Sequence, residues 1–174
     1  MKTLSDHILD IIQNSIRANA TLIEIMVEEN KITDLCLLRI TDNGHGMNKE
    51  ILEQATNPFF TTRKTRKVGL GLSLLKQNAE MANGKFSIWS EPGKGTKVEA
   101  VFQLSHVDRP ELGDIWNTIY LTILSNKNVE LEYEHKTSKG RFKKKKKKKK
   151  NKKKKNSLQL PEIREAITGL IKNN

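Results

Sequence analysis

The sequence predicts an α+β fold in which helices and strands form separate layers. Apolar residues recur with helical spacing in residues 4–20 and 69–82. Residues 23–41 and 85–104 each contain two segments with the apolar–polar alternation of strands. The resulting order, helix, two strands, helix, loop, helix, two strands, differs from the repeating strand–helix–strand units of a parallel α/β fold.

The individual elements follow from the same patterns. The first helix has an apolar face, and Ser5 or Asp6 is expected to cap its start. The helix that ends near Ala82 is followed by Asn83-Gly84, a common helix terminator. The other expected strands and helices of this part of the chain cover residues 23–28, 35–41, 48–55, 85–90 and 96–104.

The sequence changes character after Leu104. We expect apolar residues such as Trp116, Ile119 and Leu121 to pack either on the preceding domain or on a second subunit. Pro161 is expected to start a terminal helix over residues 162–172. The predicted organisation is a domain at residues 1–104, an accessory helix-strand segment at 105–142, a low-complexity lysine tract at 143–156 and a C-terminal helix at 157–174.

The formal net charge of +12 arises in the lysine tract. Lys143 to Lys155 contain twelve lysines, and without them the other 20 basic residues equal the 20 acidic ones. Mutual repulsion predicts that the tract is disordered. It is either a passive insertion or an arm that makes weak contacts with nucleic acid or another anionic surface.

Composition excludes several classes of protein. The single cysteine, Cys36, allows no internal disulfide, and its apolar neighbours indicate a buried strand thiol. No apolar run approaches the roughly 18 residues of a membrane-spanning helix. The N-terminus lacks a signal-peptide pattern, so we expect a cytoplasmic protein without a membrane span.

Three local patterns indicate a nucleotide site. Asp10, Asn14 and Arg17 are spaced i, i+4 and i+7, so they form a polar stripe on the first helix, where a carboxylate can accept a proton and an amide oxygen can ligate Mg²⁺. Asp42–Met47 is a glycine-containing turn directly after a strand. Gly69–Leu72 starts a helix, whose free backbone N–H groups attract phosphate. Each pattern also has an ordinary structural explanation: a solvated helix face, a strand-ending turn and a helix start.

In combination, these patterns resemble the GHKL superfamily, which includes gyrases, heat-shock chaperones, histidine kinases and mismatch-repair ATPases. The similarity covers about Leu4 to Leu104. It implies a two-layer α/β sandwich, the Bergerat ATP-binding fold, with a mixed sheet and helices on one face. Residues 10–21 resemble the N box, 42–47 the first glycine box, 57–63 the F box, 68–72 the second glycine box and 91–96 the glycine-threonine turn.

The resemblance implies ATP and Mg²⁺ as cofactors and assigns site residues. Asn14 would be the metal ligand, Asp42 would accept the adenine amino group, and residues 56–68 would form a lid over the phosphates. The implied binding residues are Asn14, Arg17, Asp42, Gly44, Gly46, Met47, Phe60, Thr62, Arg63, Lys64, Gly69, Leu70, Gly71, Leu72 and Thr96.

Asp10 is the implied catalytic residue. It occupies the position at which hydrolysing members of the superfamily carry a glutamate that acts as general base. Aspartate is one methylene shorter, and a displacement of about 1 Å can lower a rate roughly a hundredfold. We therefore expect slow turnover.

Three functions are compatible with the resemblance. The first is a stand-alone histidine kinase-like protein that hydrolyses ATP or transfers its γ-phosphate to a separate protein. Only Met1 to Asp10 lie at or before the start of the N box, too few residues for a phospho-acceptor hairpin. The second is an anti-sigma-type serine/threonine protein kinase. The third is an ATP-gated interaction module without significant turnover. A protein partner is expected in each case, and a homodimer is possible.

Overall fold

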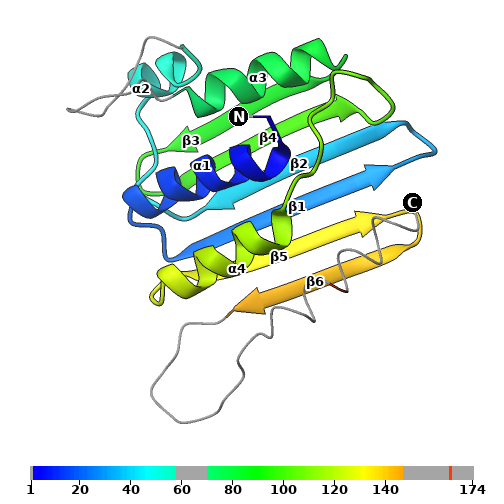
Figure 1. Ribbon diagram of the computed structural model, residues 1–174. Coiled ribbons are helices and arrows are strands. Elements are labelled where there is room, and N and C mark those ends of the chain that lie inside the picture. Colours follow the sequence, from blue (N-terminus) through cyan, green and yellow to red (C-terminus); the bar gives the residue numbers. More distant parts are fainter. Residues whose placement is uncertain (1, 58–69, 147–164, 166–174) are drawn as a thin grey trace.

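A six-stranded mixed sheet forms one layer of the protein (Figure 1). The computed structural model describes residues 2–57, 70–146 and 165. The strand order is β3-β4-β2-β1-β5-β6, in which β5 runs parallel to β1 and the other neighbours are antiparallel. The strands are β1 (Leu22–Asn30), β2 (Leu35–Asp42), β3 (Lys85–Glu91), β4 (Gly95–Gln103), β5 (Glu130–Thr137) and β6 (Gly140–Lys146).

Helices cover one face of this sheet, which confirms the predicted two-layer α+β sandwich (Figure 1). The helices are α1 (Leu4–Arg17), α2 (Lys49–Gln54), α3 (Gly71–Met81) and α4 (Ile115–Ser125). Fully buried residues such as Ile8, Leu75 and Phe102 form the core between the layers. Among the described residues no helix combines the length and apolar character needed to cross a membrane.

The cap of α1 differs from the prediction. Thr3 is the N-cap, and its Oγ1 accepts a hydrogen bond from the Asp6 backbone N–H at 3.2 Å while Asp6 Oδ2 accepts from the Thr3 N–H at 3.0 Å. This reciprocal pair is a capping box, with Asp6 in the place usually held by Glu or Gln. Ser5 is 6% exposed and bonds to the Thr3 hydroxyl, so it belongs to the buried side of the first turn.

The segment after Leu104 packs on the same sheet. Ile115 and Ile119 of α4 are buried in the core, and Trp116 packs against it, whereas Leu121 is 49% exposed. β5 extends the sheet beside β1 in parallel register, with Ile25 opposite Tyr133. Of the two expected packing sites for this segment, the structure therefore shows the first.

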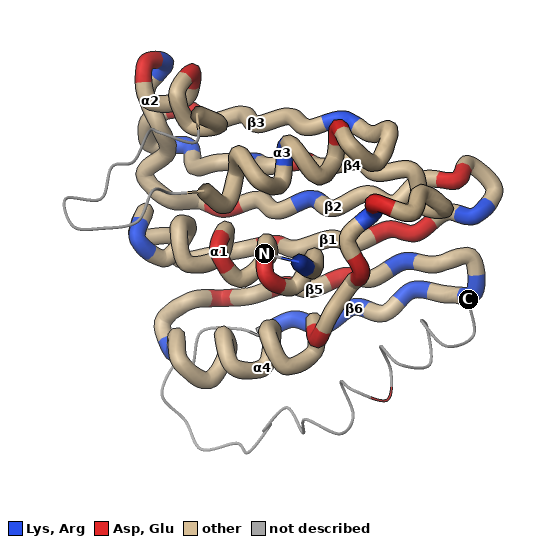
Figure 2. Tube along the Cα trace, turned by 45° about the horizontal axis from the view of Figure 1, so that its top comes forward, with Lys and Arg blue, Asp and Glu red and all other residues tan. Residues whose placement is uncertain are grey.

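The prediction that the lysine tract is disordered is wrong for its first four residues. Lys143 to Lys146 lie in β6, where Lys143 is opposite Glu134 and Lys145 is opposite Glu132 of β5. Figure 2 shows the basic positions of β6 beside β5. The cross-strand carboxylates offset the repulsion between lysines, an alternation of charge that a count of lysines alone does not reveal. Lys147 to Lys155 and the helix expected over residues 162–172 lie outside the described residues, apart from the helical Glu165.

Candidate nucleotide site

The polar stripe of α1 forms a chain of hydrogen bonds. Asn14 Nδ2 donates to Asp10 Oδ2 at 3.5 Å, and Arg17 Nη1 donates to Asn14 Oδ1 at 2.9 Å. Asp10 and Asn14 are half-buried and Arg17 is exposed. Oδ1 of Asn14, the atom predicted to ligate a metal, is thus near the surface and is oriented by Arg17. A cation bound to this oxygen would have to share it with Arg17 or displace the Arg17 hydrogen bond.

The first residue of α3 lies directly against this stripe. A Cβ added to Gly71 would overlap Oδ2 of Asp10, so a larger residue there would force the Asp10 carboxylate to move. Leu70, the N-cap, makes no side-chain capping hydrogen bond. The Leu70 side chain therefore leaves the N–H groups of the first turn of α3 uncapped, at the helix end that lies against Asp10.

Asp42 ends β2 with both carboxylate oxygens already hydrogen-bonded. Its Oδ2 accepts from the Ser15 hydroxyl at 2.6 Å, and its Oδ1 accepts from the Gly44 N–H at 2.9 Å. The side chain is 9% exposed. Each carboxylate oxygen has room for a second donor, so Asp42 is a fixed acceptor that can still bind a ligand N–H.

Glycines allow three backbone segments to meet at Asp42. A Cβ on Gly44 would lie 2.8 Å from Ala18 Cβ. Gly46 has a φ of +67° and Gly95 a φ of +94°, and a Cβ on either would overlap a backbone carbonyl, of Glu91 and of Asp42 respectively. The glycine box and the β3–β4 turn are therefore in backbone contact.

Ser90 ties the glycine box to the last strand of the predicted domain. Its hydroxyl accepts from the Met47 N–H at 2.9 Å, donates to the Gly95 carbonyl at 2.8 Å and lies 2.9 Å from Thr96 Oγ1. Thr96 is directly opposite Asp42 in the register of β2 and β4. The structure thus brings Met47 and Thr96 to the same place as Asp42.

The predicted residues fall into three groups. The first group lies along α1 and at the start of α3 and comprises Asp10, Asn14, Arg17, Leu70, Gly71 and Leu72. Within it, Leu70 is 43% exposed, while Leu72 packs against the core. The second group surrounds the end of β2 and comprises Asp42, Gly44, Gly46, Met47 and Thr96. The predicted residues Phe60, Thr62, Arg63, Lys64 and Gly69 lie outside the described residues.

Sequence reasoning missed Ser15 and Ser90. Ser15 is 2% exposed, at a position where the spacing of Ile8, Ile11 and Ile12 calls for an apolar side chain. A serine at such a position indicates a buried polar partner, here Asp42. Ser90 gives no comparable signal, because its partners come from the turn and the glycine box.

Cys36 is fully buried at the opposite end of β2 from Asp42. Burial raises the pKa of its thiol to about 12, so the side chain is a protonated, apolar-like group at neutral pH. This finding agrees with the expected buried strand thiol.

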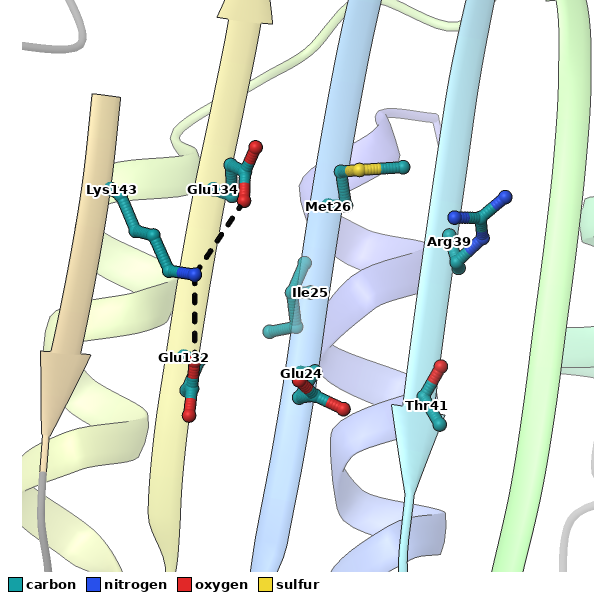
Figure 3. Close-up of a pocket in the computed structure, with 8 residues that line it drawn as sticks. All are labelled: Glu24, Ile25, Met26, Arg39, Thr41, Glu132, Glu134 and Lys143. Carbon is teal, nitrogen blue, oxygen red and sulfur yellow. Dashed lines mark ion pairs between the residues drawn. The ribbon is translucent and has the colours of Figure 1, made fainter. Parts of the chain in front are cut away.

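A shallow hollow of about 240 Å³ lies on the opposite face of the sheet from α1 (Figure 3). Glu24, Glu132 and Glu134 line it together with Arg39 and Lys143, and Lys143 is 3.9 Å from both Glu132 and Glu134. Because the sheet separates this hollow from Asp10, it is distinct from the candidate nucleotide site.

The two-layer sandwich, with a polar stripe of α1 against the glycine that starts α3, has the α+β architecture that the sequence motifs predict. Comparison with protein families assigns the chain more narrowly. A model of the histidine kinase-, DNA gyrase B- and HSP90-like ATPases matches residues 2–106, and the chain belongs to this family. The predicted GHKL membership is confirmed.

Curated relatives match the same part of the chain. The chain is 36% identical over 103 residues to a putative sensor protein of Shewanella frigidimarina, which covers 58% of this chain and 16% of that protein. It is 33% identical over 113 residues to the cell-division control histidine kinase PdhS of Brucella ovis, covering 57% of this chain and 11% of PdhS. The chain therefore spans only a small part of the length of these relatives.

Solved structures share the fold over nearly the whole chain. The N-terminal domain of a DNA repair protein has a TM-score of 0.60 with 17% identity, covering 98% of this chain and 57% of that one. The Aquifex aeolicus MutL ATPase domain complexed with ADP has a TM-score of 0.53 with 17% identity, covering 97% and 70%. At this identity the similarity shows the fold alone.

Proposed function

We propose that the protein binds Mg²⁺-ATP between α1, the start of α3 and the end of β2. We further propose that it hydrolyses the nucleotide or transfers its γ-phosphate to a separate protein. The observation that carries this proposal is Asp42, a buried carboxylate held by two donors and surrounded by glycine backbone. Since ATP is a cytoplasmic metabolite, we place this activity in the cytoplasm.

Asp42 suits an adenine base. A carboxylate held by Ser15 and Gly44 accepts but does not donate, so it favours the exocyclic amine of adenine. The corresponding position of guanine is a carbonyl oxygen, which would face the carboxylate without a proton between them. A site of this kind rejects the unmatched base strongly, because its buried polar group is left unpaired.

The α1–α3 contact suits the phosphates and the metal. The N–H groups of the first turn of α3 would bind phosphate oxygens, and the exposed edge of Asn14 offers the oxygen ligand that Mg²⁺ prefers. Few protein ligands suffice for Mg²⁺, which when bound would neutralise phosphate charge. Arg17, now bonded to Asn14, is available to contact a phosphate instead.

Asp10 would act as the general base. Its Oδ2 lies against Gly71 and accepts from Asn14, so the carboxylate is oriented toward the phosphate-binding turn. There it would accept the proton of an attacking water or of an acceptor hydroxyl or imidazole group. The relatives named as sensor proteins and histidine kinases favour a protein acceptor.

The base-recognition test compares ATP with GTP by calorimetry, with Mg²⁺ present, on wild type and Asp42→Asn. We expect wild type to bind ATP at least about a hundredfold more tightly than GTP. In Asp42→Asn the amide can rotate and donate, so this preference should largely disappear. Equal affinity for ATP and GTP in wild type would contradict the adenine assignment.

The catalytic test measures phosphate release by wild type, Asp10→Asn and Asn14→Ala. We expect slow release in wild type, loss of at least about 99% of it in Asp10→Asn and loss of Mg²⁺-dependent ATP binding in Asn14→Ala. An unchanged rate in Asp10→Asn would refute the general-base role. ATP binding without turnover or transfer would instead identify an ATP-gated module.

A further inference from the structure

A fully buried histidine joins α1 to α3 behind the candidate phosphate site. His7 is 0% exposed and lies one helical turn before Asp10 on α1. Its Nε2 is 2.9 Å from Nδ2 of Asn78, on the second turn of α3. The two helices that carry the halves of the phosphate site are thus connected by a polar bond inside an apolar layer.

The geometry determines the protonation of His7. The amide Nδ2 of Asn78 can only donate, so Nε2 of His7 accepts and the proton of the neutral ring is on Nδ1. Burial lowers the pKa of His7 below its ordinary value of 6.5, which keeps the ring neutral at pH 7.

Among the residues that the structure describes, none forms a hydrogen bond with the buried Nδ1 atom of His7. The backbone of Gly71 lies close enough to the ring to raise the pKa of His7, against the effect of burial, but it does not complete a hydrogen bond to Nδ1. A buried donor without a full partner is unfavourable and calls for an explanation. The unsatisfied Nδ1 donor lies near Gly71, the first residue of α3.

We propose that His7 is a positioning residue that sets α3 against α1 and so fixes the distance between the Gly71 turn and the Asp10–Asn14 stripe. His7 holds α3 through Asn78 and approaches its first residue through Nδ1. Gly71 in turn contacts the Asp10 carboxylate, so a small slide of α3 changes the phosphate site directly. This inference rests on the proposed function in assigning a phosphate site, while the connection between the helices stands independently of it.

The kinetic test uses Asn78→Leu and His7→Leu, which keep apolar bulk but remove the bond. We expect each to lower kcat for phosphate release at least about tenfold, because displacements below 1 Å reduce a rate strongly, with a smaller change in KM. The double variant should be no worse than either single one. His7→Gln, whose amide oxygen can accept from Asn78, should recover most of the rate.

Ile8→Val is the matched control, since Ile8 is equally buried on α1 and makes no polar bond. It should leave kcat within about twofold while lowering stability. An unchanged kcat in Asn78→Leu, additive losses in the double variant, or an equal loss of kcat in Ile8→Val would overturn the proposal.

The dependence of kcat on pH distinguishes a positioning role of His7 from a purely structural one. Protonated His7 would direct a second N–H at the Asn78 donor, so kcat of wild type should fall as the pH decreases below 6.5. The charged groups that act on His7 are Asp6, Asp10 and the N-terminal amino group, while α3 contributes the uncharged Asn78 and the Gly71 backbone. His7→Gln should shift this acid limb, and an identical limb in both proteins would contradict the role.

Hydrogen exchange without nucleotide separates this inference from the proposed function. The Leu74 amide, which bonds to Leu70, should exchange faster in Asn78→Leu than in wild type, and no faster in Ile8→Val. If wild type binds no ATP, the proposed function is wrong, and the exchange result alone decides whether His7 positions α3. Unchanged exchange of Leu74 in Asn78→Leu would overturn the connection.

Discussion

The end of β2 and the β5–β6 pair use charge in opposite ways. At the end of β2 one buried carboxylate, Asp42, is held by Ser15 and Gly44. On β5 and β6 many partly exposed charges face one another, such as Lys143, 50% exposed, opposite Glu134. A few fixed polar groups in a buried place suit specific binding, as we propose for Asp42, whereas many partly exposed pairs mostly balance charge.

The largest effect on stability is expected for Gly95→Ala. Gly95 has a φ of +94°, and an added Cβ would overlap the Asp42 carbonyl, so the β3–β4 turn must shift. We expect the free energy of unfolding to fall by about 3 kcal/mol or more. Urea unfolding checks this value.

Gly93 is the matched control for Gly95. Its φ is +75°, but an added Cβ would meet nothing within 4 Å. Gly93→Ala should therefore cost only the backbone strain, about 1 kcal/mol. Equal losses in the two variants would show that the contact with Asp42 is unimportant.

Ser15→Ala is expected to have the next largest effect. It leaves Asp42 Oδ2 without its 2.6 Å donor in a buried place, which costs about 1.5–3 kcal/mol. Ser87→Ala, at an exposed position of β3, should change the unfolding free energy by less than about 0.5 kcal/mol. A Ser15→Ala variant as stable as wild type would contradict the polar network around Asp42.

Glu29, a partly buried acid of β1 whose partner His135 lies on β5, predicts a pH dependence. The hydrogen bond from His135 is the main cause that lowers the pKa of Glu29 below its ordinary value of 4.5. A lowered pKa means that the contribution of Glu29 to stability is complete above about pH 4.5 and is lost as the pH falls toward the lowered value. The urea midpoint should therefore decline in this window, and less so in Glu29→Gln.

The smallest effect is expected for the lysines of β6. Lys143→Ala and Lys145→Ala should each change the unfolding free energy by less than about 1 kcal/mol, and added salt should reduce the difference. A larger, salt-independent loss would show that the β5–β6 pair resembles a buried network rather than exposed ion pairs.

The sequence predicted what depends on local pattern. Residue spacing gave α1, α3 and the alternation of β1, and the motif order led to the family, because neighbouring residues carry that information. The local pattern did not predict that Thr3 caps α1, because Ser5 and Asp6 are equally good N-cap residues until the buried side of the helix is known.

The remaining features depend on contacts between distant segments. Ser15 meets Asp42 across 27 residues, and His7 meets Asn78 across 71. The order of Lys143 and Lys145 depends on glutamates of another strand, so the lysines alone suggest repulsion. Such pairings become visible only when the register of the sheet and helices is known.

ATP binding by Asp42→Ala and by the double variant Lys143→Ala/Lys145→Ala tests the central claim most directly. Titration with Mg²⁺-ATP should show binding in wild type and in the lysine variant with affinities within about threefold of each other. Asp42→Ala, with its fold verified by circular dichroism, should lose at least about a hundredfold in affinity. Undiminished ATP affinity in a folded Asp42→Ala protein would contradict the site and the account built on it.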